Sequence, residues 1–330
     1  MERDFETIGG AATPVFYPSV SCVSKNMWSV IDHIDLLVSA NHPQFLVSCF
    51  DAYKSNNSKR FHAVMRQAKE QYQTVLWDSG IYEVVWSRSK RWCKNRYLKT
   101  LQRNKVSYTF SYDEYCLSKP NSSAAELVNS IKKIPYQVES HISPIVHCPD
   151  TAKYPEFCRE VSEACNPKLI AIPERELGQG VIEIAKNIRA VRKALNNQER
   201  YQNLHILGTG NPISMMLYAF SGADSFDGLD WCQTVVDYET ATLHHPLQLD
   251  LYKSQSPWGA DEGLTFFARC YMHNLAFYEK WMSALQKAII ASEELDIMRQ
   301  YLSESFVEEY CSEVLADESQ GEEIYGAVEN

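Results

Sequence analysis

The feature that most constrains the fold of this chain is an alternation of short apolar runs with segments of helical period. Eight runs have the composition of β-strands, and several end in a polar or acidic residue: TPVFYPSVS from Thr13, FLVSCFD to Asp51, TVLWDSG through Asp78, VSYTFSYDE to Glu114, ISPIVH to His147, LIAIPE to Glu174, NLHILGTG to Gly210 and ADSFDG through Asp227. Strands that alternate with helices are typical of parallel sheets, and eight such units match a barrel.

The segments between the runs carry helix start signals. SSAAELVNSIKKI opens with Ser122 or Ser123 as the N-cap and has Glu126 in the first turn. YPEFCREVSEAC and GVIEIAKNIRAVRKAL follow the same pattern, and PISMMLYAFSG has a proline at its entrance. A doubly wound open sheet is the alternative, but no GxGxxG or Walker-type glycine loop follows a strand. We therefore expect an α/β protein, a (β/α)₈ TIM barrel.

The pattern changes after the eighth run. A long helical run covers about 261–290, and SEELDIMRQYLSESFVEEYCSEV follows it. We expect these helices, over about 261–315, to flank a barrel built from residues 13–230. Residues 317–330 are expected to be a frayed acidic tail. Since there is no internal repeat or low-complexity linker, a single domain over residues 1–330 is the simplest organisation.

The composition is that of a globular protein. Hydrophobic residues make up 45% and charged residues 22% of the chain. The N-terminus lacks the apolar run of a signal peptide, and no segment has the length of a membrane span. The ten cysteines include no CxxC pair, which favours reduced thiols over a disulfide framework. We therefore expect a cytoplasmic protein without a membrane partner.

The charge is unevenly distributed. A net charge of −10 opposes nucleic-acid binding at first sight, but residues 88–105 are rich in Lys and Arg and contain no acid, while the chain after Glu293 is strongly acidic. A basic run is usually a solvated face. The alternative is a surface that binds a nucleic-acid backbone, which the interleaved Trp92 and Tyr97 favour. Its candidate contacts are Arg88, Lys90, Arg91, Lys94, Arg96 and Lys99.

The ends of the predicted strands carry the candidate chemistry. In a TIM barrel the C-terminal strand ends form the active site, and here they hold Asp51, Asp78, Asp113, Glu114, His147, Glu174 and Asp227. Each could instead be a helix cap or an ion-pair partner. Asp78 and Asp227 stand out because a glycine follows each closely and lets a planar ligand approach the backbone. Two facing carboxylates suit displacement at the anomeric carbon of a sugar. Nearby rings could sandwich a flat base or pack the barrel: Tyr17, Trp77, Tyr82, Tyr112 and Tyr115.

These segments, in their order along most of the chain, resemble the tRNA-guanine transglycosylase superfamily. TPVFYPSVSCVSKN resembles the first strand of that family, WDSGIYE its DSGGFQ motif, SYDEY its FDEC segment, and HILGTGNP its LMGVGTP turn. SPIVH stands where the family has IVQGG, and ADSFDG resembles DMFDC. MHNLAFYEKWMSALQKAI closely resembles the late helix HNLAYYQDLM.

The resemblance implies a role for several residues. Asp227 corresponds to the covalent nucleophile, Asp78 to the residue of proton transfer and base positioning, and Asp113 to the residue that binds the base edge. His147 replaces a base-contacting Gln. The further base-binding candidates are Ser79, Gly80, Tyr82, Glu174, Gly208 and Gly210.

The chain also departs from the family pattern. The structural zinc of the family uses CxCxxC and a later His, whereas here only TLHHPLQL precedes His273, so the cysteine triplet is missing. His273 with Cys270, Cys232 or His244 is a candidate substitute site, and a packed structural His is the alternative. No cofactor is expected beyond such a structural zinc. The family's GGLAVGE base-binding loop is replaced by PERELGQG over residues 173–180.

With these departures, the chain resembles the DNA-acting branch of the superfamily, the deazaguanine DNA transglycosylases of phages and bacteria. This implies replacement of guanine in DNA by a 7-deazaguanine, such as 7-cyano-7-deazaguanine, through a covalent aspartyl-glycosyl intermediate. An accessory protein that opens the duplex is a further candidate partner. The alternatives are a tRNA-guanine transglycosylase or a subunit of one, a metal-dependent barrel hydrolase that uses His147 and His244, and a non-catalytic protein that binds modified bases.

Overall fold

The structure is a computed structural model, and it describes residues 3, 5, 7–24, 28–89, 91–113, 123–135, 138–148 and 150–316. Four residues named above, Lys90, Glu114, Tyr115 and Ser122, lie outside these ranges, as does the predicted tail 317–330.

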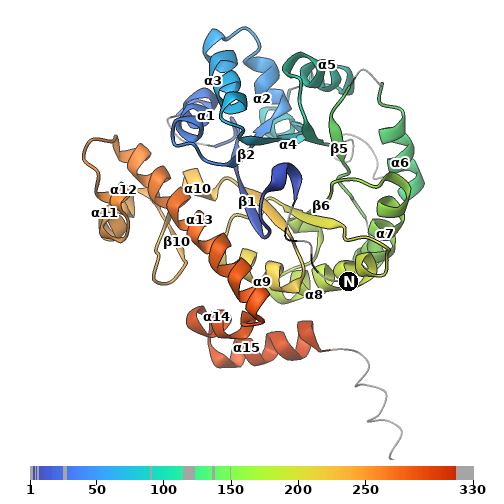
Figure 1. Cartoon of the computed structure of the whole chain (residues 1–330), viewed down its shortest axis with the longest axis vertical. Helices are drawn as coiled ribbons and strands as arrows, with labels where there is room; N and C mark the ends of the chain where they lie inside the picture. Colours follow the sequence, from blue (N-terminus) through green and yellow to red (C-terminus); the bar gives the residue numbers. More distant parts are fainter. Residues whose placement is uncertain are drawn as a thin grey trace, which may run out of the picture.

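Eight parallel strands form the centre of the molecule, in the order β5-β4-β3-β2-β1-β8-β7-β6. They are β1 Val15–Val20, β2 Gln44–Ser48, β3 Thr74–Asp78, β4 Tyr108–Phe110, β5 His141–Ser143, β6 Leu169–Pro173, β7 Asn203–Leu207 and β8 Ser225–Gly228. A parallel bridge between Ile145 and Ala171 joins the chain after β5 to β6. The strands therefore form a nearly closed ring (Figure 1), and the predicted (β/α)₈ barrel is confirmed.

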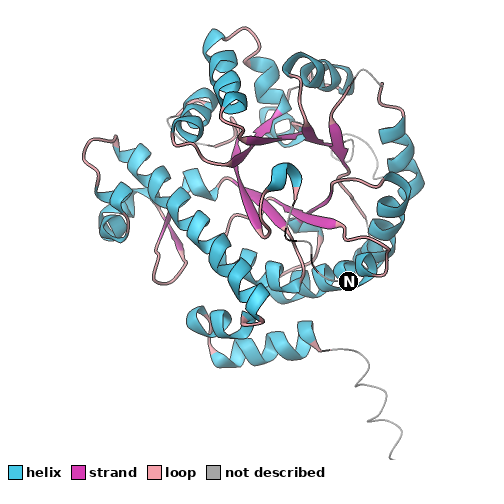
Figure 2. Cartoon of the chain, in the orientation of Figure 1, coloured by secondary structure: helices cyan, strands magenta, loops and turns pink. Residues whose placement is uncertain are grey.

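Helices surround this ring, as Figure 2 shows. They are α1 Val30–Ser39, α2 Cys49–Lys54, α3 Lys59–Glu70, α4 Ile81–Ser87, α5 Lys94–Asn104, α6 Ala124–Lys132, α7 Tyr154–Cys165, α8 Val181–Asn196 and α9 Pro212–Ser221. Ser123 caps α6 by accepting a hydrogen bond from the Glu126 N–H, as its sequence predicted. Asn211 caps α9 and satisfies the N–H groups of Ile213 and Ser214.

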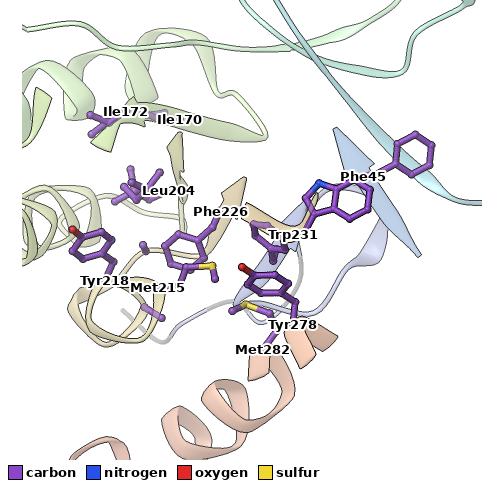
Figure 3. Close-up of a cluster of buried hydrophobic side chains, with 14 of the residues drawn as sticks. Phe45, Ile170, Ile172, Leu204, Met215, Tyr218, Phe226, Trp231, Tyr278 and Met282 are labelled. Carbon is purple, nitrogen blue, oxygen red and sulfur yellow. The ribbon is translucent and has the colours of Figure 1, made fainter. Parts of the chain in front are cut away.

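The apolar core has two parts. One fills the barrel interior with residues such as Tyr17, Leu76 and Phe110. The 3₁₀ turn η1 (Ile8–Gly10) closes the end where the strands begin: Ile8 is buried in this interior, and a Cβ on Gly9 would lie 2.0 Å from Thr74 Oγ1 at the start of β3. The larger part lies between the strands and the helices, and Figure 3 shows Leu204, Phe226 and their neighbours in it.

The elements after β8 pack against one side of the barrel. They are α10 Asp230–Gln233, a small hairpin of β9 Val235–Val236 and β10 Leu243–His244, α11 Leu249–Tyr252, α12 Pro257–Ala260, α13 Phe266–Ala291, α14 Glu294–Tyr301 and α15 Glu304–Tyr310. Trp231 from α10 and Tyr278 and Met282 from α13 join the large core (Figure 3). Among the described residues, no helix combines the length and apolar character that crossing a bilayer requires.

Several predicted boundaries were wrong. β2 ends at Ser48, so Asp51 lies in the first turn of α2 and not at a strand end. β5 ends at Ser143 because Pro144 has no N–H for the ladder, and His147 follows in a loop. The second C-terminal helix is two helices, since Ser303 caps a new helix by accepting a hydrogen bond from the Phe306 N–H.

Candidate active site

The carboxylate of Asp227 projects from β8 at the mouth of the barrel and is held by groups from two neighbouring strands. Its Oδ2 accepts a hydrogen bond of 2.6 Å from Ser19 Oγ on β1. Its Oδ1 accepts one of 3.0 Å from the Gly208 N–H, just after β7, and lies 3.2 Å from His205 Nε2. Because both oxygens are engaged, the side chain has a fixed orientation while 8% of the residue stays exposed.

Sequence reasoning missed Ser19 and His205 as site residues. His205 is wholly buried, and its Nδ1 lies 2.8 Å from Ser225 Oγ on the adjacent strand. Buried polar side chains need hydrogen-bond partners, and among the described residues both partners of the His205 ring nitrogens lie on β8. A histidine in the middle of an apolar strand was the available signal, but its partners depend on the pairing of β7 with β8.

Asp78, the second predicted carboxylate, ends β3. Its Oδ2 accepts a hydrogen bond of 2.8 Å from the Gly80 N–H. The pKa of Asp78 is raised to about 7: burial is the largest cause, the charges of Asp227 and Asp113 add to the rise, and the hydrogen bonds from the Gly80 and Ser79 N–H groups oppose it. The structure thus brings Asp227 of β8 and Asp113, which follows β4, within electrostatic reach of Asp78.

The turn after Asp78 requires its glycine. Gly80 has a φ of 83°, in the left-handed region, and a Cβ there would lie 2.7 Å from the Phe50 backbone nitrogen. Ser79 is buried, and its carbonyl accepts a hydrogen bond of 3.0 Å from Trp92 Nε1. Gly80 therefore shapes the turn through its backbone, and Ser79 does so through its carbonyl and through its hydroxyl, which accepts a hydrogen bond of 3.4 Å from the Ile81 N–H.

His147 lies between two carboxylates. Its Nε2 is 3.1 Å from Asp113 Oδ1, and its Nδ1 is 2.9 Å from Glu176 Oε1. Tyr154 donates a hydrogen bond of 2.9 Å to Glu176 Oε2. Burial alone would lower the pKa of His147, but the hydrogen bonds with Asp113 and Glu176 outweigh it and raise the pKa to about 9.

His147 is therefore an imidazolium at neutral pH, with both ring nitrogens directed at carboxylates. In this arrangement it orients Asp113, and its predicted contact with the base stays a prediction. Glu176 and Tyr154, which complete the chain of contacts, were not predicted. They come from the loop after β6 and from α7, and no local motif marks them.

The two predicted glycines after β7 differ in their surroundings. Gly208 has a φ of 80°, and nothing lies within 4 Å of the Cβ that another residue would have there, so a ligand can approach its backbone. A Cβ on Gly210 would lie 1.9 Å from Asp230 Oδ2, and one on Gly228 would lie 2.8 Å from the Gly210 Cα. Gly210 is thus required for packing between the ends of β7 and β8.

Glu174 follows β6 and is partly buried beside this turn. Burial raises its pKa, the hydroxyl groups of Tyr218 and Thr209 lower it, and the charges of Asp230 and Asp227 add to the rise. Glu174 therefore lies near the nucleophile candidate, as the predicted site requires.

Two further acids, Glu83 and Asp51, lie within electrostatic reach of each other, and Glu83 also feels the charge of Asp78. The sequence did not predict this grouping. Glu83 on α4 is buried and accepts a hydrogen bond from Ser21 Oγ. Asp51 Oδ2 accepts one of 2.7 Å from the Cys22 N–H. Burial raises the pKa of Glu83 to about 8, and the charges of Asp51 and Asp78 contribute.

The aromatic candidates fall into two groups. Tyr17 and Trp77 are buried within the strands, so they are packing residues. Tyr112 is partly buried, with its ring centroid 5.5 Å from that of Tyr97. Tyr82, in contrast, is exposed on α4.

The predicted basic run divides into a loop and a helix. Arg88 is the C-cap of α4, and α5 begins at Lys94. Arg88, Arg91 and Lys99 are exposed, whereas Lys94 and Arg96 are partly covered. The Arg96 guanidinium lies 5.2 Å from the centre of the Tyr53 ring. The interleaved Trp92 and Tyr97 are buried, so the aromatic residues of this run do not face solvent as we had expected.

Compared with known protein families and with curated proteins, the chain matches no family model and no curated sequence. Its chemistry is therefore inferred from the geometry of the site.

The candidate zinc ligands make other contacts. His273 is buried, with Nε2 2.8 Å from the Val236 carbonyl and Nδ1 2.8 Å from Ser256 Oγ. His244 Nε2 lies 2.9 Å from Thr242 Oγ1. The thiols of Cys232 and Cys270 donate to the carbonyls of Leu229 and Thr234. Within the described ranges, no three His, Cys, Asp or Glu residues are grouped to hold a metal ion. Both ring nitrogens of His273 are engaged in hydrogen bonds within the fold, and this arrangement does not fit the role of a zinc ligand that the family's His has.

Proposed function

We propose that this chain is a base-exchange transglycosylase that replaces guanine in DNA with a 7-deazaguanine, such as 7-cyano-7-deazaguanine. One observation carries the proposal: a carboxylate fixed by Ser19, Gly208 and His205 lies within electrostatic reach of a second carboxyl group with a pKa of about 7. An oriented nucleophile beside a proton donor and acceptor that titrates near neutral pH is the equipment for displacement at an anomeric carbon.

In the first half of the reaction, guanine leaves. The target nucleotide is turned out of the stack, since its glycosidic carbon is unreachable inside a duplex. The Asp227 carboxylate attacks C1′ of the deoxyribose, the C1′–N9 bond breaks, and its electron pair goes to guanine. Protonated Asp78 donates its proton to the leaving base. A covalent deoxyribosyl ester on Asp227 remains.

In the second half, the incoming 7-deazaguanine gives its ring N–H proton to the Asp78 carboxylate and attacks C1′. The ester bond breaks, and Asp227 recovers its negative charge. Asp78 ends protonated, as it began, so the exchange consumes no proton. Asp113, held by His147, accepts hydrogen bonds from the exocyclic amine and ring N–H of the base. No step uses a metal or a cofactor.

The test offers labelled guanine to DNA and tRNA side by side, followed by nucleoside analysis and denaturing electrophoresis for a DNA–protein adduct. The wild-type protein is expected to label DNA. Asp227→Asn should form no adduct and should lower exchange on the order of a thousandfold, because the nucleophile is lost. Asp250→Asn, an exposed acid on α11, is the matched control and should behave as wild type.

An adduct and normal exchange with Asp227→Asn would overturn the nucleophile assignment. Labelling of tRNA in place of DNA would reassign the polynucleotide and leave the chemistry standing. Binding of nucleic acid without any guanine exchange would favour a module that recognises modified bases.

A further inference from the structure

An exposed group of large apolar side chains on α4 has no part in the exchange chemistry. Tyr82, Val85 and Trp86 are 44%, 50% and 59% exposed. The rings of Tyr82 and Trp86 meet edge to face, with their centroids 6.1 Å apart. Contiguous apolar surface of this kind marks an interaction site more often than singly scattered residues do.

This group lies next to the candidate active site. α4 begins at Ile81, directly after the turn that carries Asp78. Trp92 ties the following loop back to that turn through its hydrogen bond to the Ser79 carbonyl. Its ring also packs against Phe50 and Tyr53, with centroids 5.7 and 5.5 Å away. The helix that carries the exposed rings therefore begins at the mouth, and the loop after it is held against the same turn.

The adjoining charges are positive. Arg88 is the C-cap of α4, and Arg91 follows in the loop. Both are exposed, and the described part of the chain forms no ion pair with either. Glu83, the acid on the same helix, is buried and faces Ser21. Aromatic faces beside exposed arginines match single-stranded nucleic acid, whose bases stack on rings while its phosphates meet cations.

We infer that Tyr82 and Trp86 form a stacking surface for an unpaired DNA nucleotide beside the exchanged guanine, with Arg88 and Arg91 at the adjoining phosphates. The inference rests on the proposed function for the position of the target strand. It changes the role expected for Tyr82, because the neighbour of the exchanged base stacks there. Turning a base out of a duplex removes a stacking partner from its neighbours, and this surface replaces that partner.

The experiment measures fluorescence anisotropy of a short labelled DNA single strand, its duplex and the RNA single strand of the same sequence. Trp86→Ala should weaken binding of the DNA single strand on the order of tenfold, because one stacking contact is lost. Trp86→Phe should restore most of it. Trp258→Ala is the matched control: Trp258 is 41% exposed on α12, outside the ring of helices in Figure 1, and its loss should change nothing.

Salt separates stacking from charge. The slope of log affinity against log salt should be unchanged in Trp86→Ala, whereas Arg91→Ala should reduce it by about 0.7 through one lost phosphate contact. Thermal melts of each variant establish that it is folded.

The stacking surface is overturned if wild type does not bind the DNA single strand, or if Trp86→Ala binds it as Trp258→Ala does. Tighter binding of the RNA strand overturns the choice of DNA. Guanine exchange measured on the same proteins separates the two proposals. Loss of binding in Trp86→Ala from a wild type that exchanges no base would sustain the surface and refute the exchange. Normal guanine exchange by the wild type, together with unchanged DNA binding by Trp86→Ala, would sustain the exchange and refute the stacking surface.

Discussion

At the scale of single residues, two aspartates meet different surroundings at one barrel mouth. Asp227 accepts hydrogen bonds from a hydroxyl and a backbone N–H and faces a buried histidine, which fixes where its oxygens point. Asp78 accepts a hydrogen bond from the Gly80 N–H in a partly buried position, and its pKa rises to about 7. Different surroundings suit two carboxyl groups to different roles: the oriented Asp227 to that of nucleophile, and Asp78 to that of proton carrier.

The raised pKa of Asp78 predicts the pH dependence of guanine release. The group is protonated below about pH 7 and loses its proton above it. Since the leaving base needs that proton, the single-turnover rate of guanine release should be level below pH 7 and fall about tenfold per pH unit above it. Asp78→Asn should be slow and should lack this limb. A wild-type rate that rises from pH 7 to pH 9 would contradict the assignment of Asp78.

At the scale of elements, a buried ion pair fastens α8 to the strands at the end of the barrel opposite the mouth. Arg192 pairs with Asp224 at 2.5 Å and donates to the carbonyls of Gly222 and Gln202. Asp224 also accepts hydrogen bonds of 2.6 Å from the Tyr201 hydroxyl and 2.8 Å from the Leu204 N–H. One carboxylate thus connects α8, β7 and the chain entering β8.

Loss of one partner of this pair should be costly. Arg192→Ala leaves Asp224 buried with fewer donors, so the free energy of unfolding should fall by about 3–5 kcal/mol, measured by urea denaturation. Arg159→Ala is the control, because Arg159 pairs with Glu156 and Glu163 on the solvent side of α7. Its change should stay within about 1 kcal/mol. Equal effects of the two substitutions would show that the buried network contributes no more than surface pairs.

At the scale of the whole molecule, the buried carboxyl groups at the barrel mouth lower the free energy of unfolding at neutral and alkaline pH. Burial raises the pKa of Asp78, Glu83 and Asp51 above their ordinary values. A carboxyl group with a raised pKa in the folded state favours folding when it is protonated. That contribution is present below the unfolded-state pKa and is lost as the pH rises through the folded-state pKa.

For Glu83 the window runs from 4.5 to about 8. Glu83→Gln should therefore gain stability relative to wild type as the pH rises through this window, by about 1–3 kcal/mol at pH 8.5 compared with pH 5.5. Thermal melts at the two pH values measure it. Glu262→Gln, at an exposed position after α12, should show no such difference. If Glu83→Gln and wild type lose stability in parallel as the pH rises, Glu83 does not carry this proton.

The sequence predicted the elements better than their contacts. α7 has the predicted bounds, Tyr154–Cys165, because its apolar spacing and its proline near the start act locally. Asp51 was misplaced because the apolar run FLVSCF continues from β2 into α2 without a change in composition. Trp92 and Tyr97 were expected at the surface of a basic run. Both rings are instead buried in the core, while the Lys and Arg side chains between them lie partly covered.

The alternation of strand and helix periods is a property of neighbouring residues, so the sequence by itself determined that this chain forms a (β/α)₈ barrel with acids at the strand ends. The partners of those acids come from residues far apart in the chain. Ser19 and His205 meet Asp227 only because β8 lies between β1 and β7, and His147 meets Asp113 and Glu176 only once the barrel closes between β5 and β6. The tertiary structure decided these contacts, since hydrogen bonds and charges act over a few ångströms of space, whatever the distance along the chain.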